Sequence, residues 1–167
     1  WVYWSSDNGT SFEPLPLNAV APPLTGVLSV AFDPKFESNR TVYAASNAAN
    51  QGVYRFIIGK STSWEGIGGT LPAGAMLGQL LVSGSGVLYA SNVKAGGGME
   101  RSLDPNYPLG PSFETVTRGL SANATLYGMW QSGRRLWAAD TANNRLLAYD
   151  DTLSQPVALT APRSAAS

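Results

Sequence analysis

The side chains that could carry out chemistry in this chain are carboxylates, hydroxyls, amides and arginines, because its 167 residues include neither His nor Cys. Serine triads, cysteine nucleophiles and imidazole or thiolate metal sites are therefore excluded. The densest group of small polar residues lies within the first twelve positions and comprises Ser5, Asp7, Gly9 and Ser11, and it is followed directly by Phe12. An aspartate two residues before a glycine is typical of a tight turn whose carboxylate accepts backbone N–H groups. We interpret this group as structural, and we predict no catalytic residue, no metal site and no cofactor.

Aromatic side chains are the best candidates for a contact surface. Trp1, Tyr3 and Trp4 crowd the start of the chain, and Tyr107 lies in a segment flanked by prolines. Loops of this kind usually run over the surface and carry binding residues. We expect these four side chains to be exposed and to contact a partner.

Composition and charge narrow the classes of partner. The chain has 11 basic and 11 acidic residues, so its formal net charge is zero, and it has no basic run. A neutral surface is not expected to bind nucleic acid. Its apolar stretches are only a few residues long, which predicts no insertion into a membrane. The apolar fraction of 44% is ample for a packed core.

A short motif recurs along the chain, with an aliphatic residue, an aromatic residue and then small residues. Its three copies are Thr41–Ser46, Val87–Asn92 and Arg135–Asp140. The aromatic positions Tyr43 and Tyr89 are 46 residues apart, and Tyr89 and Trp137 are 48 apart. A period in this range is the sequence signature of a repeat architecture. We expect Tyr43, Tyr89, Trp130 and Trp137 to lie in the core between repeats.

The local signals within each period indicate strands. Leu28–Phe32 alternates large and small residues and is followed by the turn signal Asp33-Pro34. Gly84-Ser85-Gly86 and Ser132-Gly133 each separate two apolar segments, which predicts hairpins. Four short strands per period are typical of a β-propeller blade. The sequence therefore predicts an all-β fold built as part of a β-propeller.

One motif resembles a known family. Ser5–Phe12 fits the pattern S-x-D-x-G-x-[ST]-[FW] of the Asp-box, or bacterial neuraminidase repeat, and Val30–Tyr43 is similar to a segment common in bacterial Asp-box propellers. The resemblance is to sortilin-like, sialidase-type and photosystem-assembly-type propellers. It implies that the box lies between the third and fourth strands of a blade and that Phe12 buries its ring between blades. The corresponding segment Ile57–Trp64 lacks the aspartate, and a third copy that starts at Ser102 carries an insertion.

The strand count predicts about three and a half blades. We expect a half blade with the Asp-box at 1–18, blades at 26–69, 76–118 and 125–160, and a tail at 161–167. Such a chain would form half of a seven-bladed ring, and the first blade would lack its two inner strands. Natural proteins avoid bare strand edges. We therefore expect either that the chain is a piece of a longer polypeptide, or that a protein partner or second copy completes the propeller.

Three classes of function are compatible with these features. The first is a non-catalytic β-propeller module for protein or glycan binding, or an assembly scaffold. The second is part of a glycoside hydrolase propeller of sialidase or xyloglucanase type, whose chemistry needs paired carboxylates. The third is a structural subunit of a surface layer or filament. We favour the first class, and the family resemblance implies an extracellular, periplasmic or cell-surface location.

Overall fold

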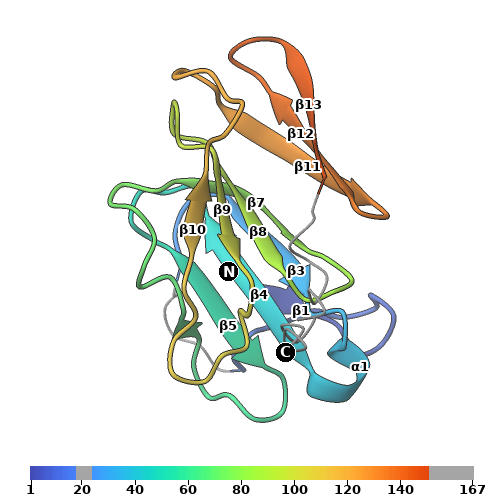
Figure 1. The fold of residues 1–167 in the computed structure, drawn as a ribbon. Coiled ribbons are helices and arrows are strands. Elements are labelled where there is room, and N and C mark those ends of the chain that lie inside the picture. The colour runs from blue at the N-terminus through green and yellow to red at the C-terminus, as the bar shows by residue number, and fades with distance from the viewer. Residues whose placement is uncertain (18–23, 151–167) are drawn as a thin grey trace, which may run out of the picture.

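The computed structural model describes residues 1–17 and 24–150 of the chain. These residues form four antiparallel sheets and one short helix, which confirms the predicted all-β class (Figure 1). The first sheet contains β1 (Tyr3–Trp4) and β2 (Glu13–Pro14). The second contains β3 (Leu28–Phe32), β4 (Thr41–Ser46), β5 (Val53–Ile57) and β6 (Glu65–Gly66). The third contains β7 (Leu77–Val82), β8 (Leu88–Asn92), β9 (Met99–Ser102) and β10 (Glu114–Val116). The fourth contains β11 (Leu126–Ser132), β12 (Arg135–Asp140) and β13 (Arg145–Asp150).

Strands that are consecutive in the chain are neighbours in each sheet. The predicted strands at 28–32 and 41–46 are confirmed as β3 and β4, and both predicted glycine turns close hairpins, β7–β8 and β11–β12. The turn after Asp33 continues into the four-residue helix α1 (Phe36–Asn39), which the sequence pattern did not indicate. This helix ends at Arg40, whose φ of 55° is left-handed. The predicted fourth strand of segment 125–160 and the predicted tail at 161–167 lie outside the described residues.

The pairing register repeats from sheet to sheet. In each of the first three sheets a glutamate on the last strand pairs with a residue of the strand before it, and this residue has the same register position in all three sheets. The pairs are Trp4 with Glu13, Arg55 with Glu65 and Arg101 with Glu114. The second and third pairs are also ion pairs, with nitrogen–oxygen distances of 2.8 and 2.7 Å. The sequence repeat therefore corresponds to a repeat of strand register.

The core lies between successive sheets, which pack face to face. Tyr43 on β4 belongs to a buried cluster shared with β7 and β8, and Tyr89 on β8 belongs to one shared with β11 and β12. These positions confirm the prediction for both tyrosines. The prediction for Trp130 is wrong, because its side chain is 64% exposed. Trp130 pairs with the half-buried Trp137 on the outer face of the last sheet, against which no further sheet packs among the described residues.

The first strands of the second, third and fourth sheets are linked by side chains at one repeated position. The backbone N–H of Leu80 on β7 donates to Ser29 Oγ on β3 over 2.8 Å. The backbone N–H of Met129 on β11 donates to Gln79 Oε1 on β7 over 2.7 Å, and Gln79 Nε2 donates back to Met129 O. In both links the acceptor side chain comes from the same register position, Ser29 or Gln79, and the backbone N–H comes from the next position of the following sheet, Leu80 or Met129. Each of these sheets is therefore placed in the same way relative to the sheet before it.

Core packing between sheets predicts a large cost for truncating Leu77. This side chain is fully buried in the cluster between the second and third sheets. We expect Leu77→Ala to lower the free energy of unfolding by about 2–5 kcal/mol, because truncation leaves a cavity. Urea unfolding followed by circular dichroism measures this loss. The matched control is Leu109→Ala at an exposed site, which should change stability by less than about 0.5 kcal/mol. Equal losses would contradict the assigned core.

Candidate functional site

The predicted Asp-box residues form a self-contained turn between β1 and β2. Ser5 Oγ donates to Asp7 Oδ1 over 2.7 Å and accepts the Gly9 N–H over 2.8 Å. The two carboxylate oxygens of Asp7 accept the backbone N–H and the hydroxyl of Ser11, over 2.9 and 2.6 Å. Gly9 has a φ of +83°, in the region that favours glycine. These bonds hold the turn together from within.

The same bonds fix the charge of Asp7. Donation from the Ser11 hydroxyl, then from the Ser11 backbone N–H and the Ser5 hydroxyl, lowers the pKa of Asp7 to about 2. A carboxylate with such a low pKa is ionised at neutral pH and is a poor general acid. The Asp7 carboxylate is therefore a hydrogen-bond acceptor, and its partners are backbone and hydroxyl groups of the same turn.

The expected burial of Phe12 between sheets is wrong. Phe12, Trp64 and Phe113 each precede the glutamate of the repeated pair, but Phe12 is 64% exposed whereas the other two are 8% and 7% exposed. Trp64 packs on the first sheet and donates its Nε1–H to Leu15 O over 2.7 Å. Phe113 packs on the second sheet, and its backbone N–H donates to Thr70 Oγ1 in the connection between β6 and β7. Each buried ring thus lies against the preceding sheet, and no sheet precedes Phe12 among the described residues.

The four candidate contact residues fall into two places. Trp1, Tyr3 and Tyr107 are exposed, whereas Trp4 is half-buried against the second sheet. Tyr3 and Trp4 line a groove beside β1, and Tyr107 lines a separate cavity formed by the connection between β9 and β10. The structure therefore does not bring all four residues together.

The connection between β9 and β10, hereafter the β9–β10 loop (residues 103–113), is fastened to the second sheet. Arg55 Nη1 donates to Pro105 O over 2.9 Å. Asn106 Nδ2 donates to Asp33 Oδ2 over 2.7 Å, across 73 residues of sequence. Arg55, Pro105 and Asp33 are all buried. The inserted loop therefore has an anchored base, although its sequence is rich in proline and exposed residues.

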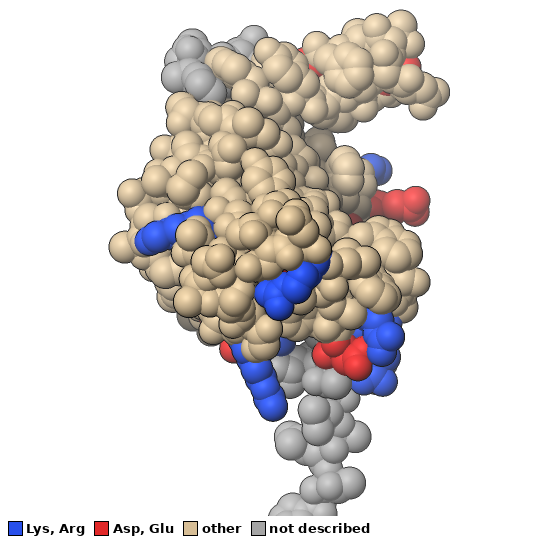
Figure 2. Space-filling model, turned by 90° about the horizontal axis from the view of Figure 1, so that it is seen from above, with Lys and Arg blue, Asp and Glu red and all other residues tan. Residues whose placement is uncertain are grey.

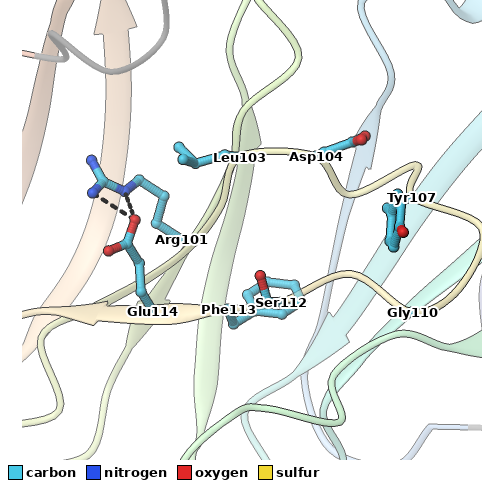
Figure 3. Close-up of a pocket in the computed structure, with 8 residues that line it drawn as sticks. All are labelled: Arg101, Leu103, Asp104, Tyr107, Gly110, Ser112, Phe113 and Glu114. Carbon is cyan, nitrogen blue, oxygen red and sulfur yellow. Dashed lines mark hydrogen bonds and ion pairs between the residues drawn. The ribbon is translucent and has the colours of Figure 1, made fainter.

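A cavity of about 590 Å³ opens beside this loop (Figure 3). The ion pair between Arg101 and Glu114 closes one end, and the ring of Tyr107 lies at the other. The carboxylate of Asp104 and the hydroxyl of Ser112 also line the cavity. An exposed aromatic ring beside a carboxylate and a hydroxyl can stack on an apolar surface while hydrogen-bonding a polar ligand.

Asp33 is a buried polar residue whose role the sequence did not reveal. Burial alone would raise the pKa of Asp33, but hydrogen bonds outweigh this effect and lower the pKa below its ordinary value. Its donors are the Lys35 N–H, Asn39 Nδ2, Asn106 Nδ2 and the Tyr43 hydroxyl. The pattern Asp33-Pro34 indicated a turn, which is correct, but no local signal indicates Asn106 as a partner. The carboxylate joins α1, β4 and the β9–β10 loop.

Charged side chains are sparse and scattered on the face of the molecule seen from above (Figure 2). Seen from above, the molecule is mostly uncharged, with a few side chains of each sign (Figure 2). Within residues 1–17 and 24–150, no three acidic side chains lie close enough together to hold a metal ion. No helix in the same residues is long and apolar enough to span a membrane.

Comparison with known proteins gives no identification. No protein-family model, no curated protein and no solved structure matches this chain. The likeness to Asp-box propellers therefore rests on the sequence motif, and function must be argued from the geometry described above.

The pKa of Asp7 predicts how the turn responds to acid. Because the folded-state pKa of about 2 lies below the ordinary value of 3.8, the ionised carboxylate stabilises the fold above about pH 4, and this stabilisation is lost as the pH falls toward 2. We expect Asp7→Asn to have a lower Tm at neutral pH, and the difference from the unaltered chain should shrink between pH 4 and 2. Thermal unfolding across this range measures it. The exposed neighbour Ser6 provides the control Ser6→Ala, which should keep the pH dependence of the unaltered chain.

Proposed function

We propose that this chain is a non-catalytic binding module made of consecutive blades of an Asp-box β-propeller. Three observations support the blade assignment. Each complete sheet has four strands in chain order, the glutamate pair repeats in register, and the links between first strands repeat at one position. The intact box connects the two strands of the first sheet, as the third and fourth strands of a blade would be connected.

The observation that carries the binding function is the anchored β9–β10 loop with Tyr107 at its cavity. A loop held in place before binding loses less conformational entropy when a ligand arrives. Tyr107 offers an apolar ring face, and Asp104 and Ser112 contribute polar side chains to the lining of the same cavity. This combination suits a glycan, whose rings have apolar faces and polar rims, and it also suits a polar protein segment. The family resemblance supports a location outside the cytoplasm.

An assembly scaffold is a second candidate function, favoured by the outer face of the last sheet. Tyr127, Trp130 and Leu146 are exposed there among neighbouring strands. An apolar face of this kind on a sheet is typical of a surface that packs on another protein.

A titration tests the role of the β9–β10 loop. The isotope-labelled chain is titrated with soluble cellohexaose, xyloglucan heptasaccharide and sialyllactose, and amide shifts are recorded by NMR. We expect at least one sugar to shift amides of residues 103–113. Tyr107→Ala should weaken this binding about tenfold or more, because the ring face is lost.

The matched control is Tyr127→Ala, which removes an equally exposed tyrosine from the last sheet. It should leave sugar binding unchanged. Shifts confined to residues away from the loop, or equal affinity of the Tyr107 and control variants, would contradict the proposal. Release of shorter sugars during the titration would favour a glycoside hydrolase instead.

A further inference from the structure

The second sheet presents an apolar face that is only half covered. Val30 and Phe32 on β3 pair with Ala44 and Val42 on β4, and residues directly paired across strands point to the same face. Ala44 and Val42 are buried in a cluster shared with the first sheet. Val30 and Phe32 are exposed. The first sheet therefore covers the β4 side of this face, whereas Val30 and Phe32 on the β3 side remain exposed.

The later sheets show what covers the corresponding position. Val30, Leu80 and Met129 are equivalent in register, because they pair with Ala44, Ala90 and Ala138 of the repeated motif. Val30 is 42% exposed, whereas Leu80 and Met129 are 4% and 6% exposed. Leu80 shares its buried cluster with Tyr43 of β4, and Met129 shares its cluster with Tyr89 of β8. In both cases the second strand of the preceding sheet supplies the covering aromatic side chain.

The first sheet lacks the strands that would do the same for Val30. It contains only β1 and β2, so one side of β1 pairs with no strand among the described residues. A groove of about 710 Å³ runs beside β1, lined by Tyr3, Trp4 and Phe12 and by Phe32 and Ile58 of the second sheet. The indole N–H of Trp4 is buried there, with no hydrogen-bond acceptor in the described part of the chain.

We propose that the free side of β1 and the bare half of the β3–β6 face form one docking site for a β-hairpin whose second strand pairs antiparallel with β1. The site continues an interface that already exists, that of the first sheet on the second. The hairpin carries the repeated motif, with its aromatic residue opposite Trp4 and a small residue opposite Tyr3, as Tyr43 lies opposite Arg55 in the second sheet. It comes from outside the described residues, because every strand from β3 to β13 is paired within its own sheet. This inference rests on the proposed function, because it treats the first sheet as a blade with only two of its four strands and names the kind of segment that would supply the other two.

Adding such a hairpin to the full chain tests the proposal. Residues 77–98 contain β7, β8 and the segment that leads into β9. A second copy of them replaces Trp1 and is joined directly to Val2, which places Ala90 of the copy opposite Tyr3 and Tyr89 opposite Trp4 in the β8–β9 register. We expect Tm to rise by about 5 °C or more, since apolar surface becomes buried. Amide exchange at Tyr3 and Trp4 should slow about tenfold or more.

Two variants separate docking from a general effect of the added residues. Val30→Glu should change the Tm of the original chain by no more than about 2 °C, because Val30 is exposed, but it should abolish the gain from the hairpin. Val27→Glu places the same charge at an exposed position before β3, and the gain should persist. No gain in the unaltered fusion, or an equal gain with Val30→Glu, would overturn the proposal.

The result is independent of the sugar titration. A chain that binds none of the sugars but is stabilised by the hairpin disproves the assigned sugar-binding loop and supports this docking site. A chain that binds sugar through Tyr107 but gains nothing from the hairpin supports the loop and disproves the docking site.

Discussion

Face-to-face packing of successive sheets is the constraint on which the rest of this structure depends. A single twisted sheet of short strands cannot bury both of its faces, so each sheet here is stabilised by the sheets that pack against it. Tyr43 fills the interface between the second and third sheets, and Tyr89 fills the interface between the third and fourth. At the two ends of the array, where no further sheet packs within residues 1–17 and 24–150, apolar side chains of the same repeat are exposed, as Phe12 and Trp130 are. The ends of the array thus differ from its middle for a reason that lies in the repeat itself.

The strands could be predicted from sequence because their signals are local. Alternation in Leu28–Phe32 and the glycines at 84–86 and 133 determine strands and turns within a few residues, and the structure confirms them. Burial could be predicted only where the neighbouring sheet is part of the described chain. Phe12 has the residue type and position of a core side chain, but it is exposed, and no further sheet packs against it among the described residues. The sequence pattern predicts which face of a strand is apolar, whereas the exposure of its side chains depends on whether another sheet packs against that face.

The candidate site depends on long-range hydrogen bonds that no sequence window contains. Asp33 follows β3, yet one of its donors, Asn106, comes from the loop of the next sheet. Arg55 forms an ion pair within its own sheet and also donates to Pro105 O in that loop. The exposure of Tyr107 could be predicted from its flanking prolines, but the anchoring of its loop could not. Asp33, Arg55 and Asn106 therefore hold the loop that carries Tyr107 in place, although none of them lines the cavity beside Tyr107.

The chain-order pairing of strands also has a kinetic consequence. Each hairpin closes a short loop, so most of the ladder can form without waiting for distant segments to meet, and topologies of this kind lower the entropic barrier to folding. In arrays whose units contact only their neighbours, structure can nucleate in one unit and propagate to the next. The second and third sheets each pack against a neighbouring sheet on both sides. We therefore expect order to spread from these two internal sheets and unfolding to begin at the two ends of the array.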